Sequence, residues 1–278
     1  MTQDNLGIIA GAGELPCAAA RSARESGRGV FVVALLGMTG DWVRDFPHAW
    51  LSLGEPGRAF KAFRAHDCAE IVLLGKVQRP RFAELKLDAK GVLLAPRVIA
   101  AALKGDDALL RSLVEMFERE GFRVVGAAQA APHLLAPMGT IGRIGPGPEH
   151  KDDIARALAV ARALGALDVG QAAIVCAGLT LAVEAAEGTD AMIARVAALP
   201  EHFRGSKARP RGVLVKAPKP IQDGKTDLPV VGVETVRNAA AVWLAGIAVE
   251  AGGALLIDRA AVVAEADRLG LFLAGVAD

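Results

Sequence analysis

Short apolar runs alternate with amphipathic stretches along the first half of the chain. Leu6–Ala10 and Val30–Leu36 have the length of strands, and between them a glycine cluster leads into an Ala-rich helical stretch that opens at Pro16. Further strands are predicted at Trp50–Leu53, Ile71–Leu74 and Phe122–Gly126, and further helices at Arg58–Arg64, Val98–Leu103 and Asp107–Glu120. Because a helical crossover makes consecutive strands parallel, this alternation predicts a doubly wound parallel sheet in an α/β fold.

The second half starts a new α/β series after a proline- and glycine-rich segment, residues 133–148, which predicts a linker. The domains are therefore expected at 1–132 and 149–278. Strands are predicted at Ala172–Val183, Val213–Lys216, Ala254–Ile257 and Leu271–Val276, and helices at Asp152–Leu164, Asp190–Ala198 (capped by Thr189) and Arg259–Leu269. The apolar run Thr235–Ala251 predicts one more helix.

Composition narrows the classes of function. A formal net charge of +1, 4% aromatic residues and no tyrosine argue against binding of nucleic acid, which needs basic and stacking surfaces. Three widely spaced cysteines without a CxxC pair fit a reducing compartment. The polar N-terminus leads directly into a strand, and no apolar run reaches the ~18 residues that span a bilayer, so we expect a cytoplasmic protein.

Two loops of the first half have the chemistry of an anion site. Gly11-Ala12-Gly13 follows the first strand at a helix N-terminus, where free N–H groups and the helix dipole favour a phosphate. Pro16 replaces the third glycine of the dinucleotide fingerprint, and the second strand ends without its acidic residue, which disfavours NAD. A nicotinamide-dependent oxidoreductase and a plain tight turn stay as alternatives.

The second loop follows the fourth strand at the same expected edge of the sheet. There Gly75, Lys76 and Arg79 combine a turn with two cations that can neutralise phosphate oxygens. Two solvated surface cations are the alternative interpretation.

The densest polar segment is residues 216–229, KAPKPIQDGKTDLP. Its three lysines suit a diphosphate, and its two aspartates suit Mg²⁺ and the positioning or deprotonation of a water. Its prolines restrict the unfolded chain, which helps hold polar groups in place before a ligand arrives. A salt-bridged surface loop is the alternative.

Seven segments occur in one order along the chain: GIIAGAGELP (7–16), the 76–80 loop, KGDDALLR (104–111), PEHKDD (148–153), LDVGQ (167–171), VEAAEGTDAM (183–192) and the 216–232 loop. Together they resemble the LpxI family of UDP-2,3-diacylglucosamine pyrophosphatases over essentially the whole chain. The resemblance implies a Mg²⁺-dependent hydrolase of lipid A (lipopolysaccharide) synthesis that releases UMP and 2,3-diacylglucosamine 1-phosphate (lipid X) by water attack on the α-phosphorus. It also implies a Rossmann-like N-terminal domain, a separate C-terminal domain, a homodimer, and transient contact with the inner membrane.

The same resemblance places the family's key aspartate on Asp227, its glycine turn on Gly11 and Ala12, and its Thr–Asp pair on Thr189 and Asp190. We predict Asp227, Asp223 and Lys225 as catalytic residues, with Asp227 and Asp223 as the metal ligands. The predicted substrate-binding residues are Gly11, Ala12, Gly75, Lys76, Arg79, Gln171, Thr189, Asp190, Lys216, Lys219 and Gln222.

Two features qualify this picture. Lys225 stands where the commonest family pattern has arginine, so a bidentate phosphate contact is lost there while the charge is kept.

The acyl chains are expected in an apolar slot at the domain cleft and along the 235–251 helix with its Trp243. Because the same cations serve binding and hydrolysis, a non-catalytic carrier of a lipid-linked nucleotide remains an alternative.

Overall fold

The computed structural model of the chain describes residues 5–77, 85–219 and 228–277. They divide into two compact units, Met1–Pro132 and His133–Asp278. Within these residues, no helix combines the length and the apolar character that a membrane crossing requires.

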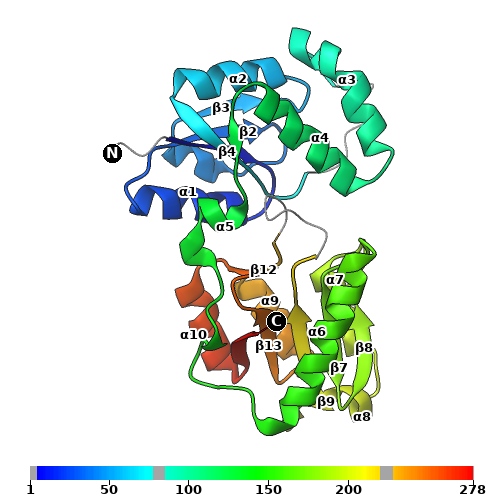
Figure 1. The fold of residues 1–278 in the computed structure, drawn as a ribbon. Coiled ribbons are helices and arrows are strands. Elements are labelled where there is room, and N and C mark those ends of the chain that lie inside the picture. The colour runs from blue at the N-terminus through cyan, green and yellow to red at the C-terminus, as the bar shows by residue number, and fades with distance from the viewer. Residues whose placement is uncertain (1–4, 78–84, 220–227, 278) are drawn as a thin grey trace. The chain divides into compact units, whose positions relative to one another are not determined.

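The first unit is a parallel sheet between two layers of helices (Figure 1). Its strands are β1 (Asn5–Ala10), β2 (Val30–Leu35), β3 (His48–Leu51), β4 (Cys68–Leu74) and β5 (Arg123–Val124), in the order β3-β2-β1-β4-β5. Its helical segments are α1 (Leu15–Glu25), η1 (Asp41–Asp45), α2 (Pro56–Ala65), α3 (Ala89–Ala102), α4 (Asp106–Arg119) and α5 (Ala127–Ala130). The predicted parallel sheet is confirmed.

An aromatic cluster fixes α2 and α4 on one face of this sheet. Phe60 and Phe63 lie three residues apart on α2 and therefore share a face. Both meet Phe117 of α4 edge to face, with ring centroids 5.1 and 6.3 Å apart. These rings are at most 2% exposed, and burial of such large side chains is the main stabilising contribution to this layer.

The strand order changes direction between β1 and β4. From β1 the chain continues to β2 on one side and later returns to β4 on the other side. In doubly wound sheets ligands bind outside the carboxyl ends of the strands at such a point. The predicted loops after β1 and β4 lie at this point.

The second unit has a six-stranded mixed sheet in the order β6-β15-β13-β11-β7-β8. Its strands are β6 (Gly139–Thr140), β7 (Ala172–Cys176), β8 (Leu179–Val183), β11 (Val213–Lys216), β13 (Gly246–Glu250) and β15 (Phe272–Val276), with the small pairs β9 (Gly205–Ser206) and β10 (Arg209–Pro210), and β12 (Val230–Val231) and β14 (Leu255–Leu256). Its helical segments are η3 (Pro132–Leu134), η4 (Pro148–His150), α6 (Lys151–Ala166), α7 (Thr189–Ala197), α8 (Glu201–Arg204), α9 (Val233–Ala241) and α10 (Arg259–Leu269). The separate α/β fold of this half is confirmed.

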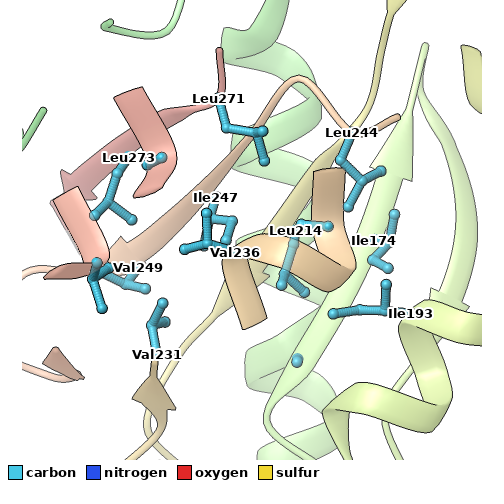
Figure 2. Packing of buried hydrophobic residues seen from close by; sticks show 14 of the residues in the cluster. Ile174, Ile193, Leu214, Val231, Val236, Leu244, Ile247, Val249, Leu271 and Leu273 are labelled. Atoms are coloured by element: carbon cyan, nitrogen blue, oxygen red, sulfur yellow. The ribbon is translucent and has the colours of Figure 1, made fainter. Parts of the chain in front are cut away.

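Two apolar layers hold this sheet in place. On one face, Ile174, Leu214 and Ile247 of the strands pack with side chains of the helices, among them Val236 of α9 (Figure 2). On the other face, α6 packs against β7 and β11. The central strands are consequently buried on both sides and read as continuous apolar runs.

This double burial explains one wrong prediction, the single helix over 235–251. Helix α9 ends at Ala241, and the rest of the apolar run becomes the central strand β13 between β11 and β15. Periodicity cannot separate a buried strand from a buried helix in such a run. Most of this run therefore packs inside its own unit, which removes the helical face that was expected to hold acyl chains.

Two other segments differ from their predictions. The stretch 172–183 is a hairpin, because Ala177 and Gly178 turn the chain with φ values of +50° and +77°. Helix α7 begins at Thr189 with Gly188 as its N-cap, so Thr189 is not the cap.

The segment expected as a linker, 133–148, is packed on the second unit. Its strand β6 pairs with β15, and Ala136 is 2% exposed and donates its N–H to the Ala254 carbonyl at 2.9 Å. Proline and glycine remove periodicity from this segment, but backbone hydrogen bonds still join it to the sheet.

Candidate functional site

Four predicted binding residues of the first unit meet in one glycine corner, which we define as Gly11, Ala12, Gly75 and Lys76. The Ala12 N–H donates to the Lys76 carbonyl at 2.8 Å, and the Lys76 N–H donates back to the Ala12 carbonyl at 2.9 Å. The Gly11 N–H donates to the Leu74 carbonyl at 2.8 Å. The loops after β1 and β4 are thus cross-linked just before α1, and the N–H groups of Gly11, Ala12 and Lys76 are committed to carbonyls.

Glycine is required in this corner because the two backbones almost touch. Gly75 has a φ of +91°, and a Cβ there would lie 2.7 Å from the Ala12 oxygen and 2.9 Å from Cγ of Pro16. A Cβ on Gly11 would lie 2.6 Å from the Lys76 oxygen. Pro16, the departure from the dinucleotide fingerprint, therefore forms part of the wall against which the β4 loop packs.

Three predicted residues of the second unit meet around a fourth that was not predicted, Glu184. Lys216, at the end of β11, is 4% exposed and donates from Nζ to Thr189 Oγ1 and to the Val230 carbonyl, both at 2.9 Å. Thr189 Oγ1 donates to Glu184 Oε1 at 2.6 Å. The N–H of Gln171 donates to Glu184 Oε2 at 3.1 Å. We call Lys216, Thr189, Glu184 and Gln171 the lysine relay.

Glu184 had a weak signal in the sequence. It is the first charged residue after the uncharged strand β8, and it is 7% exposed. A buried carboxylate is unusual unless it is paired or hydrogen-bonded. Burial, however, is a property of the folded chain, so the sequence alone left Glu184 indistinguishable from the neighbouring acidic residues.

The other two described residues of the predicted set have different partners. Asp190 is exposed and accepts from Asn238 Nδ2 of α9 at 3.0 Å, so the Thr189–Asp190 pair divides between two environments. Lys219 forms an ion pair with Asp168 at 2.7 Å. That carboxylate partially neutralises the charge that was expected to meet a phosphate.

Asp223, Asp227, Lys225, Gln222 and Arg79 lie outside the described residues, so their roles stay predictions. Within the described part of the chain, no three His, Cys, Asp or Glu side chains gather as a metal site. Gln171 Oε1 is a buried oxygen for which these residues supply no hydrogen-bond donor.

Comparison with known proteins covers both units. The LpxI N-terminal domain matches residues 5–134, and the LpxI C-terminal domain matches residues 137–274. The chain is 50% identical over 271 residues to the UDP-2,3-diacylglucosamine pyrophosphatase LpxI of Caulobacter vibrioides, which covers 98% of this chain and 97% of that protein. A solved UDP-glucose-4-epimerase from Stenotrophomonas maltophila aligns with 52% of this chain and 40% of the epimerase chain, at 14% identity and a TM-score of 0.25. This structural similarity is too low to indicate a shared fold or function. The chain therefore belongs to the LpxI family.

Proposed function

We propose that this protein hydrolyses the pyrophosphate bond of UDP-2,3-diacylglucosamine to UMP and 2,3-diacylglucosamine 1-phosphate. The observation that carries the proposal is the 50% identity, over 98% of the chain, to a relative named for that pyrophosphatase activity. The lysine relay adds physical support, because a buried cation at the end of a strand suits a substrate rich in negative oxygens.

The reaction needs cations and an aligned water more than it needs covalent chemistry. In the proposed step a water oxygen bonds to the α-phosphorus, while the bond from that phosphorus to the bridging oxygen breaks. The bridging oxygen leaves on the lipid phosphate, and the water gives up a proton. Negative phosphate oxygens repel the incoming oxygen, so catalysis depends on positive groups placed before the substrate arrives.

The residues divide these tasks. In the proposal Lys216 contacts the diphosphate oxygens while the Thr189 hydroxyl holds its ammonium, and Asp227 positions the water and accepts its proton. Asp223 and Lys225 assist in the same loop, with Lys219, Gln222, Gln171, Asp190 and Arg79 as further substrate contacts. In the first unit, the glycine corner is proposed to meet a phosphate or a uridine-side group through the Lys76 side chain, because the N–H groups of Gly11, Ala12 and Lys76 already donate to carbonyls.

Magnesium, held by Asp223 and Asp227, is part of the proposal. The described residues fit a hard cation only in part. Gln171 Oε1 is a buried acceptor without a donor among them, whereas both oxygens of Glu184 already accept hydrogen bonds. When bound, Mg²⁺ would neutralise phosphate oxygens.

The proposal also includes the assembly and location of the protein: a homodimer in the cytoplasm that makes transient contact with the membrane that receives the lipid product.

The test is product analysis with the purified chain, UDP-2,3-diacylglucosamine and Mg²⁺. We expect UMP and 2,3-diacylglucosamine 1-phosphate from the wild type, no UMP from Asp227→Ala, and wild-type turnover from the control Asp41→Ala, whose carboxylate is 87% exposed. The unfolding free energy of Asp227→Ala should stay within ~1 kcal/mol of the wild type.

Three other results would each point elsewhere. Wild-type turnover by Asp227→Ala would remove Asp227 from the mechanism. Binding of the nucleotide lipid without turnover would favour the carrier alternative. Micromolar binding of NADH or NADPH, read from fluorescence, would favour the oxidoreductase.

A further inference from the structure

The direction of every hydrogen bond in the lysine relay is fixed by chemistry. An ammonium only donates and a carboxylate only accepts, so the single hydroxyl proton of Thr189 must point to Glu184. A lone pair of the same hydroxyl then faces Lys216 Nζ. The carboxylate of Glu184 consequently sets the orientation in which Thr189 can hold the lysine.

Glu184 is itself held by backbone on two sides. Its own N–H donates to the Ala172 carbonyl at 2.9 Å, and its Oε2 accepts from the Gln171 N–H at 3.1 Å. Gly170 allows this approach, because a Cβ there would lie 2.1 Å from the Glu184 carbonyl oxygen. The carboxylate therefore has a fixed position and transmits it through Thr189 to the lysine.

We propose that Glu184 is a positioning residue, which acts through the Thr189 hydroxyl to hold the Lys216 ammonium in the geometry that meets the diphosphate. The inference rests on the proposed function. A buried ammonium is stable only with nearby negative charge and full hydrogen bonding, and Glu184 supplies negative charge one hydroxyl away. Glu184 need not touch the substrate to affect turnover.

Glu184→Gln is the sharpest perturbation because it keeps the size and removes one acceptor. If the amide NH₂ faces Gln171, it meets the N–H of that residue, donor against donor. If the NH₂ faces Thr189, the hydroxyl loses the carboxylate acceptor of its proton. Either arrangement disturbs the relay while the fold keeps a side chain of the same shape.

The experiment measures kcat and KM for UDP-2,3-diacylglucosamine hydrolysis, with thermal melts of each variant. The matched control is Glu187→Gln, since Glu187 lies three residues away, pairs with Arg195 at 2.7 Å and is outside the relay. We expect Glu184→Gln to lose roughly 10–100-fold in kcat/KM, by analogy with the loss when a group that orients a metal ligand is removed. The loss should fall mainly on kcat, because an orienting defect acts on the transition state. Glu187→Gln should match the wild type.

A folded Glu184→Gln protein with kcat/KM within twofold of the wild type would overturn the proposal, and so would an equal loss in Glu187→Gln. If Glu184→Gln does not fold, the pair Thr189→Val and Thr189→Ser decides. Both are close in size to threonine, but only serine keeps the hydroxyl that joins Glu184 to Lys216, so serine should retain at least tenfold more kcat/KM than valine. Equal values would overturn the proposal. A wild type without hydrolysis defeats the proposed function itself, whereas an active wild type with an equally active Glu184→Gln defeats only the positioning role.

Discussion

Gly75→Ala tests whether the glycine corner depends on close approach of two backbones. The new Cβ would lie 2.7 Å from the Ala12 oxygen and 2.9 Å from Cγ of Pro16, at a φ of +91°. The positive φ costs an alanine about 1–2 kcal/mol, and overpacking against backbone adds about 1–3 kcal/mol. We therefore expect the opening free energy of the first unit to fall by about 2–5 kcal/mol.

The matched control is Gly121→Ala, in the same unit. Gly121 has a φ of +90°, but its new Cβ would meet nothing within 4 Å. This variant should show only the backbone cost of about 1–2 kcal/mol. Hydrogen exchange of the β1 and β4 amides, followed by mass spectrometry of the full-length chain, reports the opening of this unit separately from the second. Equal losses in the two variants would refute the close-approach reasoning.

Two further predictions concern the second unit. The Asp153 carboxylate accepts from the Ala177 and Gly178 N–H groups at 2.8 and 2.7 Å. Asp153→Ala should therefore lower the unfolding free energy, measured by urea titration, by about 2–3 kcal/mol. If the exposed Asp152→Ala lost as much stability as Asp153→Ala, the prediction would be contradicted. Hydrogen bonds from Arg268 and Arg237 lower the pKa of Glu265 from 4.5 to about 2. Because the folded-state pKa is the lower one, the stabilisation by the ionised Glu265 is present above pH 4.5 and is lost as the pH falls toward 2. The melting temperatures of the wild type and Glu265→Gln should therefore converge over that pH range. A difference that stays constant with pH would refute the assignment.

Much of the first unit could be predicted because its local signals agree with its topology. Each strand there is followed by a turn or a helix with its own periodicity, and glycine marks the boundaries. The rule that ligands bind at the carboxyl ends of parallel strands predicts Gly11 and Gly75 at one edge of the sheet. The structure shows that their loops are joined by hydrogen bonds.

The second unit shows where sequence patterns fail. Residues 239–249 carry no charged side chain, and only the neighbouring strands β11 and β15 make residues 246–250 a strand. Thr189 has the residue type of a helix cap, yet its hydroxyl donates to Glu184 in the folded chain. Glu184 became a candidate only through its burial and partners, which are tertiary properties.

Hydrolysis in water enriched in ¹⁸O tests the proposed chemistry most directly. The purified chain is incubated with UDP-2,3-diacylglucosamine and Mg²⁺, and both products are weighed by mass spectrometry. Attack on the α-phosphorus predicts one ¹⁸O atom in UMP and none in 2,3-diacylglucosamine 1-phosphate. Label in the lipid phosphate instead, or no cleavage at all, would contradict the proposed function.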